Sequence, residues 1–265
     1  MLLAQISDTH VTPAGRGTGY SGDTGPALAR CVNAIMTGAP APDAVIATGD
    51  LANAGSADEY ERLRELLAPL AIPVYLMPGN HDRRSTLRRA FPDHAYLPAT
   101  GSLHYVVDRY DVRLVMLDTV IEGEDGGTLD AAQLSWLDAA LAAPPRKPTL
   151  IFMHHPPVCT GIHRMDSIRL EPGSAARLGE IVARSDRVER IACGHVHRTT
   201  HARWQGTVVS ICPSTAFQAQ ADLRAEGEFS ATQEPPAYQT HYWNGAQLVT
   251  HTISLPAAME TERNS

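Results

Sequence analysis

The feature that most constrains this chain is a repeated pairing of an apolar run with a short polar block. Runs with the composition of strands occupy 2–7, 44–48, 73–77, 149–153 and 190–193, and each leads directly into such a block. The blocks are SDTH (7–10), TGDLAN (48–53), PGNHD (78–82), HHPP (154–157) and CGHVH (193–197). Ligands of open α/β sheets bind outside the carboxyl ends of the strands, so we expect the blocks to converge on one site.

Helical patterns lie between these runs. Ser56 with Glu59 forms a capping-box pattern ahead of YERLRELLAPL, and Asp130 with Gln133 forms a similar one ahead of LSWLDAALA. Further helices are expected at 26–36 and 174–184, and further strands at 103–107 and 113–117. Such alternation predicts βα units and layered sheets flanked by helices.

The last quarter of the chain has a different character. It predicts strands at 207–212, 238–243 and 247–255, with a hairpin turn at Asn244-Gly245. The segment 218–237 between them is polar and lacks periodicity. A loop of this length in a compact domain is typically either functional or disordered.

Composition limits the classes of partner. The formal charge of −7 and the pI near 5.9 provide no basic stripe, so we expect no nucleic-acid polymer as a partner. The chain has no signal-peptide pattern and no apolar run near the roughly 20 residues of a membrane span, so we expect no membrane partner and a cytoplasmic location. Its four cysteines lack C-x-x-C spacing, which favours reduced thiols without excluding disulfides.

The polar blocks contain the donors of a transition-metal site. Together they hold three carboxylates, six histidines and two asparagines, and imidazole with carboxylate suits zinc, iron, manganese or cobalt. Each block alone is compatible with ordinary turn chemistry, but five at strand ends are not expected by chance. The surplus over one tetrahedral zinc predicts two metals, with Asp50 as a natural bridge. Their charge would attract an anionic phosphoryl group.

Strand geometry restricts how neighbouring histidines can act. Adjacent residues of an extended chain point in opposite directions, so we expect His154 and His155 to diverge and to supply at most one ligand. His195 and His197 alternate along the chain, so on an extended segment they would face the same metal cluster.

The order Asp8-x-His10, Gly49-Asp50, Gly79-Asn80-His81-Asp82, His154, Gly194-His195-x-His197 resembles the signature of the calcineurin-like metallophosphoesterase superfamily. Within this superfamily, the residues in and around the motifs are most similar to those of bacterial class III cyclic nucleotide phosphodiesterases and the related glycerophosphodiesterases. The resemblance implies an α/β fold, a four-layer α/β/β/α sandwich with two mixed central sheets. It also implies a catalytic core at 1–200, and strands, a long loop and a tail at 201–265 that complete the sheet and form a cap or an oligomer contact.

The same resemblance allocates the residues of the site. The first metal would be held by Asp8, His10 and His197, the second by Asn80, His154 and His195, with Asp50 between them. The two ions, iron, manganese, zinc or cobalt, would carry the hydroxide that attacks phosphorus. His81 would be the catalytic residue that stabilises charge or protonates the leaving oxygen, and Asn80, His81 and His197 would contact the substrate.

Several residues near the motifs receive alternative interpretations. His155 is expected to fix the turn into Pro156, and Asp82 either to orient a histidine or to cap a helix near Thr86.

The loop 13–23, with Tyr20 and Arg16, either covers the site or is a plain mobile loop. His163 and Arg164 either reach a substrate or are solvated. Where the glycerophosphodiesterases have a histidine after PGT, this chain has PSTAF, and its Phe217 would stack on a nucleobase.

The leading hypothesis is a binuclear metal-dependent phosphodiesterase that hydrolyses small diesters, 3′,5′-cyclic nucleotides first. Alternatives of the same class are a glycerophosphodiesterase, a broad-specificity phosphomonoesterase and a nucleotide pyrophosphatase, which share its attack chemistry. A non-catalytic scaffold of the same fold is the alternative from another class, although no ligand is substituted here. A nuclease of polymeric DNA or RNA is disfavoured by the acidic charge. A homo-oligomer, first of all a dimer, is expected.

Overall fold

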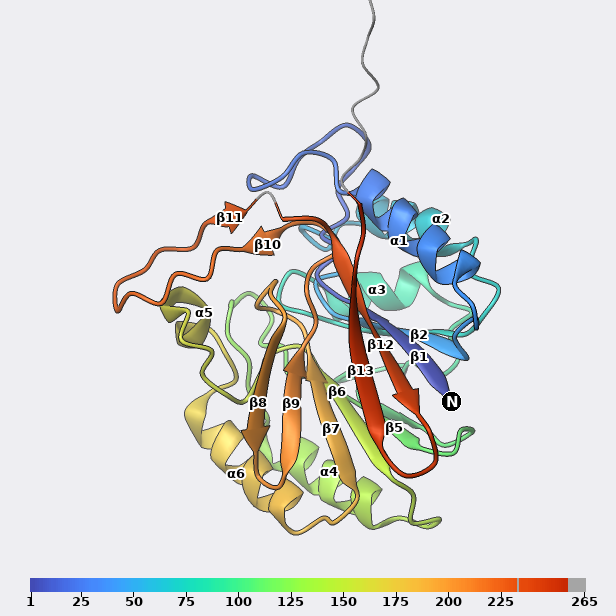
Figure 1. The fold of residues 1–265 in the computed structure, drawn as a ribbon, viewed down its shortest axis with the longest axis vertical. Coiled ribbons are helices and arrows are strands. Elements are labelled where there is room, and N and C mark those ends of the chain that lie inside the picture. The colour runs from blue at the N-terminus through green and yellow to red at the C-terminus, as the bar shows by residue number, and fades with distance from the viewer. Residues whose placement is uncertain (233, 257–265) are drawn as a thin grey trace, which may run out of the picture.

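Two large mixed sheets form the centre of the computed structural model, which describes residues 1–232 and 234–256 (Figure 1). The first sheet has the order β13-β12-β1-β2-β3, in which β1, β2 and β3 are parallel and β12 is antiparallel to β1. Its strands are β1 (Leu2–Ile6), β2 (Ala44–Thr48), β3 (Val74–Met77), β12 (Ala237–Trp243) and β13 (Leu248–Ser254).

The second sheet has the order β4-β5-β6-β7-β9-β8, in which β5, β6, β7 and β9 are parallel and both edge strands are antiparallel to their neighbours. Its strands are β4 (Tyr105–Val107), β5 (Arg113–Leu117), β6 (Thr149–Met153), β7 (Val188–Cys193), β8 (Thr200–Trp204) and β9 (Thr207–Ile211). A short pair, β10 (Gln218–Ala219) and β11 (Ala231–Thr232), lies apart from both sheets.

Helices cover the outer faces of the two sheets. One apolar cluster joins the first sheet to the outer helices α1 (Gly25–Thr37), α2 (Ala57–Leu67) and α3 (Arg84–Ala90). A second cluster joins the two sheets to each other and to α4 (Ala131–Ala142) and α6 (Pro172–Ala183). The predicted four-layer α/β/β/α sandwich is therefore confirmed. None of the helices in the described residues is long and apolar enough to cross a membrane.

Local sequence signals account for most of the elements. Every strand that the sequence predicts is present, and each end differs by at most two residues. Both capping boxes form; in the second, the backbone N–H of Gln133 donates to Asp130 at 2.8 Å and the backbone N–H of Asp130 donates to the Gln133 side chain at 3.0 Å. These reciprocal bonds satisfy donors that would be unpaired at the start of α4.

The pattern did not predict β8, the two-residue strands β10 and β11, or the short helix α5 (His163–Ser167). β8 is a half-exposed edge strand, so it lacks the apolar run that marks a buried one. In the polar segment, residues 218–232 extend away from both sheets, with β10 paired to β11, and the chain between these two strands runs toward α5 (Figure 1). Strands after residue 200 contribute to both sheets, β8 and β9 to the second and β12 and β13 to the first.

The topology brings the polar blocks together. Each of β1, β2, β3, β6 and β7 ends at the residue where a polar block begins or just before it. Because β1, β2 and β3 are parallel in the first sheet, and β6 and β7 are parallel in the second, the five carboxyl ends lie at one edge of the two packed sheets.

Candidate metal centre

One group of donor atoms lies beyond β1, β2 and β7. The ligand atoms of Asp8, His10, Asp50 and His197 all lie within 4.8 Å of one another. Nε2 of His197 is 3.0 Å from Nε2 of His10 and 3.4 Å from Oδ1 of Asp8. Nε2 of His10 is 3.6 Å from Oδ2 of Asp50. Four donors from three strand ends thus face one small volume.

A second group lies beside the first and shares Asp50 with it. Oδ1 of Asn80 is 3.1 Å from Nε2 of His154 and 3.1 Å from Nδ1 of His195. Oδ1 of Asp50 is 3.4 Å from Nε2 of His154. The two oxygens of Asp50 therefore face different groups, which is the arrangement of a bridging carboxylate. All seven residues that the sequence proposes as ligands are brought together.

The chemistry of these donors fits metal ions. Asp8 is 0% exposed and Asp50 is 2% exposed, and within the described part of the chain their ion-pair partners are histidines, not lysine or arginine. Burial lowers the pKa of His10 and of His195, which favours the neutral form that binds metals. Two buried carboxylates need compensating positive charge, which a neutral imidazole such as that of His10 does not supply. Transition-metal ions would supply it.

The carboxylates also affect His154. Burial alone would lower the pKa of His154, but the charges of Asp50 and Asp8 raise it to about 9. A proton on His154 thus provides part of the positive charge that the carboxylates attract. Since a metal ligand must be deprotonated, a metal ion would compete with this proton for the same nitrogen.

Backbone carbonyls orient two of the ligand rings. Nδ1 of His154 donates to the carbonyl of Thr48 at 2.8 Å, and Nδ1 of His197 donates to the carbonyl of Phe217 at 2.9 Å. Each bond fixes the ring so that its Nε2 faces the other candidate metal ligands, as is usual for metal-binding histidines. In His197, Nδ1 therefore faces a carbonyl, and Nε2 faces His10 and Asp8.

The backbone at the site adopts a conformation that most residues avoid. Asp8, His10, Asp50, His195 and His197 have φ between 40° and 73°, and in the described residues only one other non-glycine residue has a positive φ. Each costs about 1–3 kcal/mol and persists only where the surroundings enforce it. The expectation that His195 and His197 converge on an extended segment is wrong; they converge because both have left-handed backbones beyond β7.

Glycines permit the close approach of the blocks. A Cβ on Gly49 would lie 2.5 Å from Nδ1 of His154, and one on Gly79 would lie 2.2 Å from Oδ1 of Asp50. Since real Cβ atoms do not approach so closely, either side chain would displace a donor of the site. Gly49, before Asp50, and Gly79, before Asn80, belong to the sequence motifs, but only the fold shows that each glycine packs against a donor from another block.

His81 lies at the edge of both groups and lines the pocket above them. Its backbone N–H donates to Oδ1 of Asp50 at 2.9 Å, and its Nδ1 donates to the carbonyl of Asn53 at 2.6 Å. The charge of Asp50 raises the pKa of His81. With Nδ1 engaged, Nε2 is the nitrogen that remains for a substrate oxygen.

Asp82 has a role that the sequence did not predict. Its carboxylate accepts hydrogen bonds from four donors of the two neighbouring loops and of α2: the backbone N–H groups of Leu51, Ala52 and Gly79, and the hydroxyl of Tyr60. It neither orients a histidine nor caps α3. Burial and the nearby Asp50 raise the pKa of Asp82 to about 6. Asp82 therefore joins the loops that present Asp50 and Asn80.

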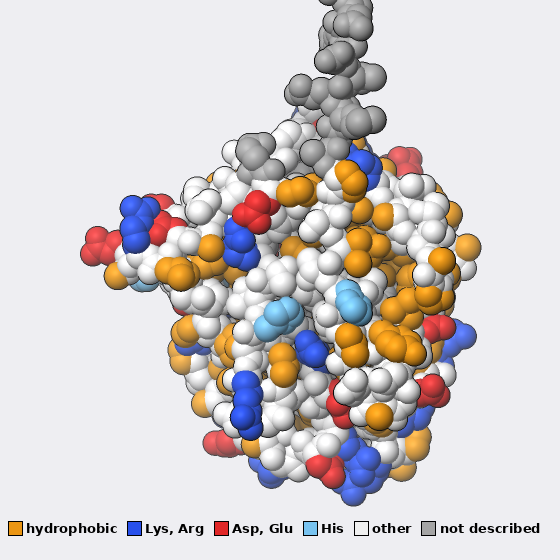
Figure 2. Space-filling model, in the orientation of Figure 1, with side chains coloured by type: hydrophobic (Ala, Val, Ile, Leu, Met, Phe, Trp, Pro, Cys, Tyr) orange, Lys and Arg blue, Asp and Glu red, His pale blue; other side chains and the backbone are white. Residues whose placement is uncertain are grey.

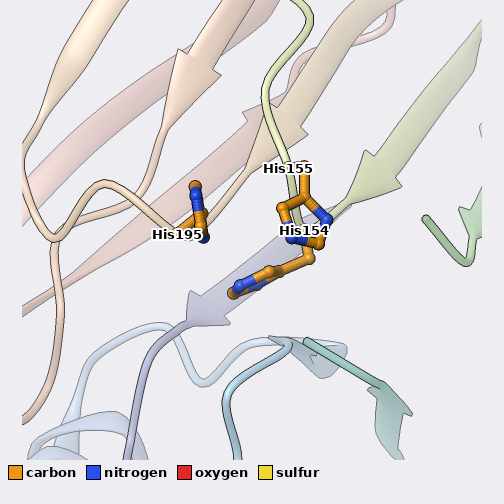
Figure 3. Close-up of side chains that lie close together, drawn as sticks. All are labelled: His154, His155 and His195. Carbon is orange, nitrogen blue, oxygen red and sulfur yellow. The ribbon is translucent and has the colours of Figure 1, made fainter. Parts of the chain in front are cut away.

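The side chains of His154 and His155 are expected from the sequence to point apart, but their rings lie close together. Both follow the end of β6, and their centroids lie 4.9 Å apart with the planes nearly perpendicular (Figure 3). His155 accepts from the hydroxyl of Thr119 at 2.8 Å and donates from Nε2 to the carbonyl of Asp125 at 3.1 Å. Its ring also packs 4.6 Å from that of His195. His155 thus supports a ligand ring and the Asp125 loop, and its ring does not fix the turn into Pro156.

An open pocket of about 270 Å³ lies over the donor groups. Of the candidates in the neighbouring loops, Tyr20, Arg164 and Phe217 line it, whereas Arg16 and His163 do not. Arg164 donates to the Asp125 carboxylate at 2.8 Å at the rim. The sequence missed Asp125, Met165, Ile168 and Phe229, because these residues lie in irregular segments or in the short α5 without a motif.

Comparisons with known proteins agree with this geometry. The family model described as calcineurin-like phosphoesterase matches residues 1–199. A probable glycerophosphodiester phosphodiesterase of Arcobacter nitrofigilis is 36% identical over 253 residues, which cover 95% of this chain and 92% of that protein. A probable cyclic nucleotide phosphodiesterase of Rhodopseudomonas palustris is 36% identical over 258 residues, covering 96% and 93%. A crystal structure of a dimetal phosphatase from Danio rerio superposes with a TM-score of 0.68, at 15% identity and 96% coverage of both chains, a likeness of fold.

Proposed function

Because this chain belongs to the calcineurin-like phosphoesterase family, we propose that it is a metal-dependent phosphodiesterase that hydrolyses small phosphodiesters, 3′,5′-cyclic nucleotides first. The observation that carries this proposal is the pair of donor groups that share Asp50 at the base of one pocket. His81 and Asn80 line the same pocket, where a phosphoryl group would lie.

The residues that would hold the ions follow from the two groups. One ion would be held by Asp8, His10 and His197 and the other by Asn80, His154 and His195, with Asp50 between them. When bound, such a pair supplies positive charge for the phosphoryl oxygens and lowers the pKa of water toward neutrality, so that water can displace the leaving alkoxide from phosphorus.

The chain's own side chains would position the diester and the leaving oxygen. His81 is fixed by its bond to the Asn53 carbonyl, so its Nε2 edge is directed to the pocket, where it would donate to a phosphoryl or leaving oxygen. Asn80 directs its oxygen at His154 and His195, which leaves its amide N–H groups for a phosphoryl oxygen. Asp82 and the Thr48 carbonyl would keep these groups in place.

A glycerophosphodiesterase is the second candidate, because relatives with that name and with the cyclic nucleotide name match at the same identity. The residue at position 217 counts against a glycerol head group. It occupies the stretch where the glycerophosphodiesterases are expected to have a histidine, and its ring lies 4.5 Å from that of His197 with no polar group to offer a glycerol hydroxyl.

The substrate class is tested by comparing initial rates on 3′,5′-cyclic AMP, glycerophosphocholine, bis(4-nitrophenyl) phosphate and 4-nitrophenyl phosphate after reconstitution with one metal. We expect higher kcat/KM for the diesters than for the monoester, and for cyclic AMP than for glycerophosphocholine. A protein that turns over only the monoester would be a phosphomonoesterase, and no turnover with two bound metals would favour the scaffold.

Two finer points are part of the proposal. The ions would be iron, manganese, zinc or cobalt, since nitrogen and oxygen donors accept all four; elemental analysis of the purified protein identifies them.

A dimer contact would involve the C-terminal strands. Figure 2 shows apolar side chains on the side of the molecule where β12 and β13 lie. Two exposed apolar side chains belong to these strands, Tyr242 of β12 at 48% exposure and Ile253 of β13 at 36%. Light scattering after chromatography gives the oligomeric state.

A further inference from the structure

Three aromatic rings from distant parts of the chain form one side of the pocket. Tyr20 comes from the loop 13–23, Phe217 from the segment after β9, and Phe229 from the excursion between β10 and β11. The ring centroid of Tyr20 is 4.8 Å from that of Phe229 and 5.7 Å from that of Phe217. These are the separations of packed aromatic pairs, so the three rings form one surface.

The three rings differ in what they can offer a ligand. Phe217 is only 6% exposed, and its ring packs at 4.5 Å from that of His197 and 5.5 Å from that of His10. Phe217 therefore supports the first donor group. Tyr20 is 59% exposed, and Phe229 meets it edge to face. The ring surface open to a ligand thus belongs to Tyr20 and Phe229, and the expectation that Phe217 itself stacks on a base is revised.

The rest of the pocket lining near the rings is partly apolar and partly charged. Met165 and Ile168, from α5 and the residue after it, provide apolar lining, and the Asp125–Arg164 ion pair provides a carboxylate and a guanidinium. A nucleobase has two apolar faces and an edge of donors and acceptors, so it can use the aromatic surface and the ion pair together. A glycerol head group has hydroxyls that the aromatic surface would leave without partners.

We propose that Tyr20 and Phe229 bind the base of a nucleotide substrate by stacking, and that they set the preference of the site for nucleotides over base-free diesters. The inference rests on the proposed phosphodiesterase function. It gives the loop 13–23 and the excursion 218–237 a shared role: each contributes one ring of the base-binding surface. The donor groups are left unaltered, so both substrate types would undergo the same hydrolysis.

The test uses the metal-reconstituted full chain with Tyr20→Ala and Phe229→Ala. Stacking of one base on an aromatic side chain corresponds to about a 5- to 100-fold effect. We expect KM for 3′,5′-cyclic AMP to rise within that range, while kcat/KM for glycerophosphocholine changes less than about twofold. Met36→Ala, which removes an exposed apolar side chain of α1 outside the pocket, is the control and should change neither value.

Binding of the product separates the inference from the proposed function. Calorimetry should show weaker binding of 5′-AMP to both variants than to the wild type, with unchanged binding of glycerol 3-phosphate, and this comparison needs no turnover. Equal losses for both ligands, or no loss for 5′-AMP, would overturn the stacking role even if the enzyme cleaves diesters. A wild type that cleaves no diester would overturn the proposed function, while selective loss of 5′-AMP binding would still support the base-binding surface.

Discussion

Replacing His154 with alanine removes one donor from the second group and leaves its neighbour His155 in place. Nε2 of His154 lies 3.1 Å from Oδ1 of Asn80 and 3.4 Å from Oδ1 of Asp50, and its ring is fully buried. The variant keeps Asn80, His195 and one oxygen of Asp50 for the second ion, and it leaves the first group complete. We therefore expect the metal content to fall from about two equivalents to about one.

The effect on activity follows from what the second ion contributes. Charge stabilisation by a bound metal is worth several kcal/mol in the transition state, and every 1.36 kcal/mol is a tenfold change in rate. The loss of one ion should thus lower kcat by roughly a thousandfold or more. The assay combines elemental analysis of the dialysed protein with initial rates on bis(4-nitrophenyl) phosphate.

His155→Ala is the matched control, because it removes an equally buried histidine from the next position. His155 uses its nitrogens on Thr119 and Asp125 and supports the ring of His195. Loss of such an outer partner lowers metal affinity or activity by about 10- to 100-fold. This variant should still bind two ions at saturating metal. If His155→Ala loses an ion and His154→Ala keeps both, the assignment of the donors at the end of β6 is wrong.

Three further changes test the surroundings of the site. Removal of the metals with a chelator should lower Tm, because Asp8 and Asp50 then remain buried without compensating cations; an unchanged Tm in calorimetry would contradict this. Asp82→Asn replaces one acceptor oxygen with a donor and should lower the free energy of unfolding in urea by about 2–4 kcal/mol, since backbone N–H groups lose their partners; a loss below about 0.5 kcal/mol would count against the role of Asp82. Arg62 and two backbone N–H groups hold the pKa of Asp23 at about 2, below its unfolded value near 3.9, so its contribution is present above about pH 4 and is lost as the pH falls through 2. Asp23→Asn should remove this acid-side loss from stability curves measured between pH 5 and 2, and identical curves would refute it.

The central part of the site was predictable because its signals are local. Each ligand block follows a strand, and the end of a strand can be recognised from the apolar run before it. Parallel pairing of β1 and β2 brings Asp8 and Asp50 to one edge of the first sheet, and the packing of the second sheet adds His154 from the end of β6. The local patterns therefore predicted the strand ends and their convergence, whereas the four-layer sandwich and the allocation of the donors to two groups came from the family resemblance.

The surroundings of the donors could not be predicted in the same way. Tyr20 and Phe229 lie in segments without periodicity, and only the fold brings their rings to 4.8 Å. Strand geometry does not apply to His155, His195 and His197, because β6 ends at Met153 and β7 ends at Cys193. His195 and His197 also have positive φ, which an extended strand does not. Left-handed backbone at non-glycine residues is enforced by tertiary contacts, so propensity gives no signal for it.

Anomalous diffraction from crystals of the metal-reconstituted protein would locate the ions directly. We expect two peaks, on opposite sides of the Asp50 carboxylate. One would lie next to Asp8, His10 and His197, and the other next to Asn80, His154 and His195. A single peak at full occupancy, or a second peak with no contact to Asp50, would contradict the two-metal centre.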